Sequence, residues 1–334
     1  MGVRLFLVCL LLLSSCATTS PPVEQARRPV STSSTRLPIL FVHGFFGFAE
    51  LPLIGGFVPG LRDALAAQGQ QVFFADLPAF SAPSIRAPVL ARRIQEVLDV
   101  TGAQKLHIIA HSLGGIDARK AMADFDLDDK VFSLTTLSTP HQGLTFAPGM
   151  AMLPDGVYAP VLGPVKGVVD VIRGHSVGPL APASAMQQVH VDAMAAFNKA
   201  HPAPPGVHLF TIAGVSGHPD KHCSGPWGKL PFEDAPVVVL LPNYLVLRGA
   251  PTDAVANDGV IPVRAARFGR FLGCIPADHN DEVNWGFDGL SAPHTRQLDM
   301  KAFYVELGQR LMRLEDTNDP AVLDVPFHLQ PQAL

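Results

Sequence analysis

The chain has 334 residues, of which 48% are hydrophobic and 16% are charged, and its formal net charge is −4. This length and apolar content suffice for the core of one large domain, which we place at residues 37–315, with a C-terminal tail at 316–334. Because the sequence has no basic stripe or long run of like charge, nucleic acid is excluded as the expected partner.

The first residues have the composition of an export signal followed by a tether. A basic start precedes the apolar run Leu5–Leu13, which is too short to span a membrane. The run ends in Leu-Ser-Ser before Cys16, which resembles a bacterial lipobox, where the signal is removed and the cysteine is acylated. A plain secretory signal with a chance cysteine is the alternative. We predict a signal peptide over 1–15, a flexible tether over 16–36 and, because Ala17 follows the cysteine, an anchor in the outer membrane.

Apolar segments then alternate with helical ones, as in a mostly parallel sheet whose two faces are covered by helices. The expected strands are 38–44, 70–76, 105–112, 131–139 and 207–215, and the expected helices between them include 59–69 and 88–102.

The segment KLHIIAHSLGG (105–115) has the strand, sharp turn and helix pattern of a nucleophile elbow. Such a turn holds Ser112 at the end of a parallel sheet, and its strained backbone requires small neighbours, here Ala110 and Gly114. Ala110 is a mild departure from the usual G-x-S-x-G. An ordinary strand-to-helix turn is the alternative. The pattern predicts an α/β-hydrolase fold, class α/β, in which Ser112 is a nucleophile.

Such a nucleophile needs an acid and a histidine base, which in this fold follow it in that order. Asp258 lies in an Asn-Asp-Gly loop before an apolar segment, as does an acid at a strand end, and His279 lies in a polar loop downstream. We predict the triad Ser112, Asp258 and His279. His294 is a rival base, but it opens the expected last helix. Asp278 is a rival acid, but its position beside His279 hardly lets it reach the ring nitrogen.

Two backbone N–H groups must also face the oxyanion that forms during the reaction. Leu113, directly after the nucleophile, supplies one of them. A His43-Gly44 turn after the first apolar strand places Phe45 to supply the other. His43 precedes Ser112, so chain order excludes it as the base, and we expect it to shape the loop.

The stretch 144–191 interrupts the alternation and is rich in Gly, Pro, Met and Val. It separates the strand ending at Ser138 from the one beginning at Val207. We predict a lid over the site, because so long an insertion usually has a function. An ordinary excursion with buried helices is the alternative.

Several segments occur in the same order as in secreted bacterial triacylglycerol lipases of the Pseudomonas/Burkholderia type, and the chain resembles that family from Leu37 to Leu314. The most specific are HG-x-x-GF and H-x-D-E-V-N, and the others are GLRDALAAQGQQVFFADLPAF, VTGAQKLHIIAHSLGGIDAR, LSTPHQGLTFA, AMAAFNKAHPAP and NDGVIPVRAARFG. The resemblance implies the same triad and the same oxyanion donors, and it leaves open a dedicated folding chaperone as a partner.

The resemblance also implies a structural calcium ion beside the histidine loop, although catalysis needs no cofactor. Asp281 matches the second calcium carboxylate of the family. Trp285 replaces the usual Gln, which binds through its backbone carbonyl. The window of the first carboxylate reads PVVV at 236–239, and Asp234 is the nearest candidate. The alternative is that Asp281 only hydrogen-bonds its own loop.

Cys223 and Cys274 form an even pair in loop-like stretches of an exported chain, so we expect a disulfide between them, at a different place from the family's bridge. Two separate buried thiols are the alternative.

Together these features predict a membrane-tethered serine carboxylester hydrolase that acts on lipid or ester substrates, most specifically a triacylglycerol lipase. A short-chain esterase, a polyester depolymerase or a lipid acyltransferase would use the same groups. A non-catalytic surface lipoprotein with this fold is the alternative of a different class.

Overall fold

The chain divides into two units, Met1–Ser33 and Ser34–Leu334. A computed structural model describes parts of the second unit, and every structural statement below refers to these parts. They are residues 36–45, 50–51, 55–145, 178–216, 256–283 and 298–331, with the single positions 156, 163, 167, 170, 223 and 226. No helix within these ranges is long and apolar enough to cross a membrane.

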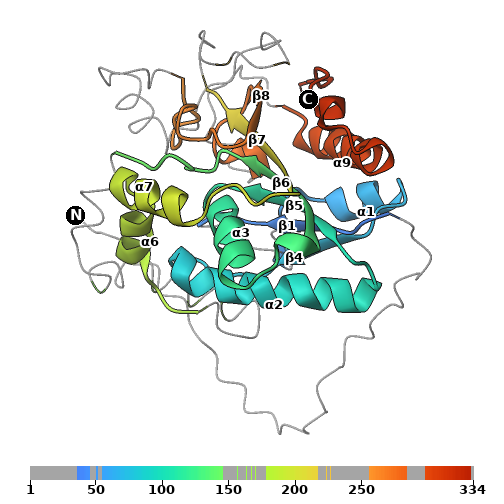
Figure 1. The fold of residues 1–334 in the computed structure, drawn as a ribbon. Helices are drawn as coiled ribbons and strands as arrows, with labels where there is room; N and C mark the ends of the chain where they lie inside the picture. The colour runs from blue at the N-terminus through green and yellow to red at the C-terminus, as the bar shows by residue number, and fades with distance from the viewer. Residues whose placement is uncertain are drawn as a thin grey trace, which may run out of the picture. The chain divides into compact units, whose positions relative to one another are not determined.

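Six parallel strands form the central sheet in the order β4-β1-β5-β6-β7-β8 (Figure 1). Their bounds are β1 Ile39–Val42, β4 Val72–Ala75, β5 Leu106–His111, β6 Val131–Leu137, β7 His208–Gly214 and β8 Arg270–Ile275. A separate two-stranded ribbon joins β2 (Glu50–Leu51) to β3 (Gly55–Gly56). The sheet confirms the predicted fold class, including all five expected strands.

Helices cover both faces of the sheet, and a separate hydrophobic cluster lies on each face. On one face lie α2 (Pro83–Thr101) and α3 (Leu113–Asp124), and on the other lie α1 (Leu61–Ala66) and α9 (Met300–Thr317) (Figure 1). Successive side chains of a strand point to opposite faces. In β1, accordingly, Leu40 and Val42 join the α2–α3 core, whereas Ile39 and Phe41 join the α1–α9 core.

Three expectations need correction. Strand β8 contains Cys274, so this cysteine does not lie in a loop. The apolar segment after Asp258 forms turns rather than a strand, because Asp258 lies in the connection from β7 to β8. The last helix, expected to open at His294, begins at Met300, where the Asp299 side chain caps it by accepting the N–H of Ala302.

The C-terminal residues form part of this unit. The short 3₁₀ helix η6 (Pro320–Leu323) follows α9, and both Leu323 and Phe327 are buried in the same core as α9. The predicted tail is therefore packed at least as far as Phe327. Apolar burial of this kind is what fixes a chain end to a domain.

Of the predicted insertion at 144–191, the structure describes mainly the two ends. The N–H of Leu144 donates to Val189 O at 2.9 Å, so the ends lie side by side. The C-terminal end contains α6 (Pro182–Gln188), which α7 (Val191–Ala200) follows. Most of the predicted lid lies outside the described residues, and the lid stays a prediction.

Cys223 and Cys274 are joined by a disulfide in the structure, with their Cα atoms 5.3 Å apart. The bridge closes a loop with a sequence separation of 51 residues. A crosslink of this span limits the conformations of the unfolded chain, which contributes about 2–4 kcal/mol to the free energy of unfolding.

Replacing both cysteines by serine (C223S/C274S) should therefore lower the urea midpoint of unfolding by an amount equivalent to about 2–4 kcal/mol. Urea titration followed by circular dichroism, with and without dithiothreitol, measures this. Reductant should lower the midpoint of the natural chain and leave that of the double variant unchanged. Equal midpoints for all four samples would show that the bridge adds no stability.

Candidate active site

The nucleophile turn lies between β5 and α3, where the sequence predicted it. Ser112 has φ 54° and ψ −130°, a backbone conformation that non-glycine residues rarely adopt. Two hydrogen bonds hold it there: its N–H donates to Leu137 O at 2.9 Å, and the Thr139 hydroxyl donates to its carbonyl at 2.7 Å. The turn raises the serine side chain above the end of the sheet, as a nucleophile elbow does.

Small residues surround this turn because larger ones would not fit. A Cβ atom on Gly44 would lie 2.7 Å from Ser112 Cβ, and one on Gly114 would lie 2.7 Å from Val42 O. A Cβ on Gly115 would lie only 2.7 Å from a methyl carbon of Thr139. The glycines thus allow the first strand, the nucleophile turn and the end of β6 to approach closely.

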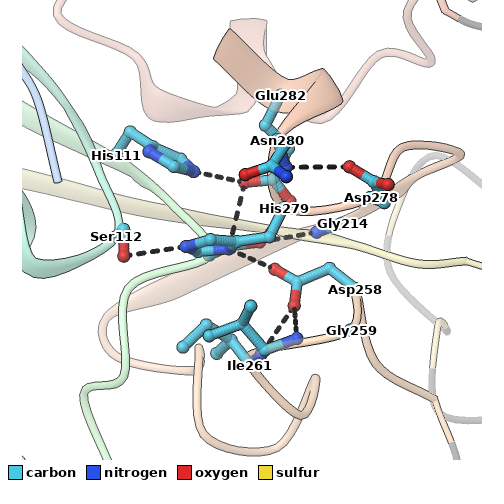
Figure 2. Close-up of polar contacts among 12 residues, drawn as sticks. His111, Ser112, Gly214, Asp258, Gly259, Ile261, Asp278, His279, Asn280 and Glu282 are labelled. Atoms are coloured by element: carbon cyan, nitrogen blue, oxygen red, sulfur yellow. Dashed lines mark hydrogen bonds and ion pairs between the residues drawn. The ribbon is translucent and has the colours of Figure 1, made fainter. Parts of the chain in front are cut away.

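The three residues of the predicted triad lie in one hydrogen-bonded chain (Figure 2). Ser112 Oγ is 2.9 Å from His279 Nε2, and His279 Nδ1 is 2.8 Å from Asp258 Oδ2. Asp258 is fully buried, and its Oδ1 accepts the N–H groups of Val260 (2.8 Å) and Ile261 (2.5 Å). This arrangement lets His279 accept the serine proton while the buried carboxylate fixes the imidazole tautomer.

The rival acid has a different function. Asp278 Oδ1 accepts the N–H groups of Asn280 and Asp281 at 2.8 and 2.9 Å, which shapes the loop that carries His279. Asp258 O accepts the His279 N–H at 2.9 Å, so the acid also fixes the backbone of the base. His294 lies outside the described residues.

A second buried carboxylate, Glu282, lies on the other side of the His279 ring (Figure 2). Its Oε1 accepts the Ser138 hydroxyl at 2.5 Å, and that hydroxyl in turn accepts the Gly214 N–H at 2.9 Å. Its Oε2 lies 2.9 Å from His111 Nε2, at an angle too bent for a hydrogen bond.

Burial favours the uncharged forms of Glu282 and His111. Loss of hydration, reinforced by the charges of Asp258 and Asp278, raises the pKa of Glu282 well above its ordinary value. Loss of hydration, together with the nearby His279, lowers the pKa of His111 well below its ordinary value. Of the two buried acids of the site, Glu282 is thus the one whose surroundings favour the protonated form.

The two predicted oxyanion donors belong to residues next to the nucleophile turn: Leu113 follows Ser112, and Phe45 follows Gly44, which approaches Ser112 closely. Leu113 is the first residue of α3, and its N–H has no hydrogen-bond partner within the described ranges. This N–H group lies at the N-terminus of α3, where the partial positive charge of the helix dipole is located. The carbonyl of Phe45 accepts the Phe80 N–H at 2.9 Å, and the two rings pack edge to face. His43 shapes this loop as expected, with Nε2 accepting the Leu77 N–H.

One buried arginine joins the oxyanion loop to the nucleophile helix. The guanidinium of Arg86 donates to Asp117 Oδ2 (2.7 Å), to His43 O (2.6 Å) and to Pro78 O (3.0 Å). Both Arg86 and Asp117 are fully buried. A planar guanidinium can satisfy three acceptors in fixed directions, which a lysine cannot do.

Most of the residues predicted to bind calcium lie outside the described ranges. Asp234 and Trp285 lie outside the described residues, as does the lipobox Cys16. Asp281 opens a 3₁₀ turn, η4 (Asp281–Val283). One carboxylate does not make the set of several oxygens that calcium requires. The residues that are described therefore provide no complete calcium site, and the ion stays a prediction.

Sequence reasoning missed the buried residues that support the triad, namely Arg86, His111, Asp117, Ser138, Gly214 and Glu282. Two of them had a visible signal: His111 directly precedes the nucleophile, and Glu282 lies within the H-x-D-E-V-N segment. The others come from distant parts of the chain and meet only in the fold.

Comparison with known proteins agrees with this fold. A family model described as alpha/beta hydrolase fold matches residues 38–167. A triacylglycerol lipase of Burkholderia plantarii is 34% identical over 118 residues, 34% of this chain and 32% of that protein. A triacylglycerol lipase of Pseudomonas fragi is 26% identical over 311 residues, 83% of this chain and 97% of that protein.

Among solved structures, the Staphylococcus hyicus lipase is similar with a TM-score of 0.61 and 16% identity, covering 90% of this chain and 99% of that one. Likeness at this identity shows the fold. The match spans about a third of the Burkholderia relative and nearly all of the Pseudomonas relative. These findings confirm the α/β-hydrolase fold and the resemblance to bacterial triacylglycerol lipases.

The two carboxylates should respond differently to loss of charge. Asp258→Asn should lower kcat for a p-nitrophenyl ester by about 10⁴-fold, because the amide disfavours the required His279 tautomer. Glu282→Gln should cost less than about tenfold, because burial already favours the uncharged form of Glu282 and the amide oxygen can still accept from Ser138. Steady-state kinetics of the two purified variants test this. Equal losses would mean that Glu282 carries a catalytic charge.

Proposed function

We propose that this chain is a serine carboxylester hydrolase, and more specifically a triacylglycerol lipase. The observation that carries the proposal is the unbroken hydrogen-bond path from Ser112 Oγ through His279 to the buried Asp258, next to a strained nucleophile turn. The relatives named triacylglycerol lipase support the choice of substrate class.

In the proposed reaction, His279 Nε2 takes the hydroxyl proton of Ser112 while Oγ bonds to the ester carbonyl carbon. The carbonyl oxygen becomes an oxyanion, which accepts hydrogen bonds from the N–H groups of Leu113 and Phe45. The imidazolium, stabilised by Asp258, then protonates the leaving alcohol, and the tetrahedral species collapses to an acyl-enzyme. Water attacks this ester with His279 as the base again, which releases the fatty acid and restores Ser112.

Three further features are proposed on the sequence and the family resemblance. They are a lid within 144–191 that covers the site, a structural calcium ion near Asp281, and a lipid anchor at Cys16 that holds an exported chain at the outer membrane. A dedicated folding chaperone also stays a prediction. None of them takes part in the proton transfers above.

The proposed activity is tested by hydrolysis of p-nitrophenyl esters from acetate to palmitate with protein that lacks residues 1–16. We expect turnover, with a maximum on long chains for a lipase and on short chains for an esterase. Ser112→Ala should lower kcat by about 10⁶-fold, because the nucleophile is lost.

Adding calcium or EDTA to the same samples tests the calcium proposal through the thermal unfolding midpoint, which should rise with calcium. Two results would contradict the hydrolase function: equal activity of Ser112→Ala and the natural chain, or no turnover on any ester by folded protein. The second result would favour a non-catalytic lipoprotein.

The anchor is tested separately with the full chain in a bacterial host. Cys16→Ala should abolish incorporation of radioactive palmitate and move the protein from the detergent-rich to the aqueous phase of Triton X-114, because acyl chains supply the membrane affinity. Ser14→Ala, which keeps a small residue in the signal, is the matched control. Unchanged partition of the Cys16 variant would refute the anchor.

A further inference from the structure

Asp117 is the counter-ion of the arginine beneath the oxyanion loop. It lies on α3, five positions and so about one and a half turns after Ser112. Its Oδ2 accepts from Arg86 Nε at 2.7 Å, and both side chains are fully buried. Its Oδ1 has no hydrogen-bond partner in the described part of the chain. The carboxylate is thus held by a single charged donor.

Arg86 uses its remaining donors on the loop that leads to Phe45. Nη2 donates to His43 O at 2.6 Å and Nη1 donates to Pro78 O at 3.0 Å. Carbonyl oxygens can accept these hydrogen bonds, but they do not neutralise a buried positive charge. The Asp117 carboxylate does so, and its place on α3 fixes where the guanidinium plane lies.

We propose that Asp117 is a positioning residue for the oxyanion hole: its negative charge orients Arg86, which fixes the His43–Phe45 loop against the nucleophile turn. This inference rests on the serine hydrolase function proposed above. Asp117 touches no substrate and acts only through Arg86.

The negative charge of Asp117 orients Arg86, but it does not increase the free energy of unfolding. Burial raises the pKa of Asp117 from 3.8 to about 6, although Arg86 partly opposes this. In the unfolded chain the group ionises at lower pH than in the folded one. The free energy of unfolding therefore falls as the pH rises between these two values. A gain in folding stability therefore does not explain why an acid is buried here. Its interaction with Arg86, which holds the His43–Phe45 loop, does explain it.

No other charge competes with Arg86 for this carboxylate among the residues described. At the end of β1, His43 faces the pair with its carbonyl, while its ring accepts from Leu77. At the end of β5, burial keeps His111 neutral. On α3 itself, Lys120 pairs with Asp124 and Arg119 donates toward α7.

Protonation of Asp117 should consequently loosen the oxyanion hole. This protonation should steepen the fall of log kcat/KM with decreasing pH over the range in which Asp117 takes up its proton, compared with an enzyme that lacks this acid.

The test compares Asp117→Asn with Glu306→Gln, in the protein that lacks residues 1–16. Glu306 forms a similar pair with Arg310 within α9, outside the site. D117N should lower kcat at pH 8 by about 10–100-fold, with KM within threefold, because the oxyanion donors are displaced. Its affinity for phenylboronic acid, which binds serine as a tetrahedral anion, should fall by a similar factor. The additional steepness of its acid limb should disappear.

Thermal unfolding separates position from stability. D117N should have a lower midpoint than the natural chain, because the buried Arg86 loses its counter-ion, but it should remain folded at the assay temperature. E306Q should keep its activity. Natural kcat and boronate affinity in D117N would overturn the proposal, as would a loss of kcat explained by a smaller folded fraction. If Ser112→Ala retains turnover, the hydrolase function itself fails, which is a different outcome from either of these.

Discussion

The strained backbone of Ser112 is the constraint on which the rest of the site depends. A positive φ at a non-glycine residue costs on the order of 1–3 kcal/mol and persists only where its surroundings over-determine it. Here Leu137 O accepts the Ser112 N–H and the Thr139 hydroxyl donates to the Ser112 carbonyl, so both fix the turn. Gly44 and Gly114 allow the end of β1 to contact the turn. This backbone conformation places the hydroxyl beside His279, and it requires small residues at two separate places in the chain, at Gly44 and at Gly114–Gly115.

The two buried acids show how hydrogen bonding assigns a role to chemically similar groups. Asp258 accepts two backbone N–H groups besides its contact with His279, so its carboxylate is held in one orientation. Glu282 is as deeply buried, but within the described residues its carboxyl accepts a hydrogen bond from the Ser138 hydroxyl alone, and burial and nearby acids raise its pKa. A Cβ on Gly214 would collide with this carboxyl, so the acid requires a glycine at this position of β7.

The elements that the sequence predicts well are those with a repeated apolar pattern. Five of the six strands of the central sheet and the nucleophile turn follow from such patterns. The candidates Asp258 and His279 follow from the order in which the acid and the base occur after the serine in this fold. Strand β8 was missed because RFLGCI contains a charge and a glycine within six residues. Arg86 and Asp117 were missed because an isolated charged residue in a helix is expected to face water. Only the fold shows that they meet 31 positions apart.

The two halves of the site are anchored to different layers of the molecule. Arg86 and Asp117 belong to α2 and α3, and they hold the nucleophile and the oxyanion loop on one face of the sheet. The histidine loop is held from the opposite face, where the Tyr304 hydroxyl of α9 donates to Glu282 O at 3.0 Å. The central sheet separates these two supports, and the contacts described for them involve different side chains. A change in one helical layer can therefore alter the alignment of the oxyanion hole without moving the base, and the reverse holds for the other layer.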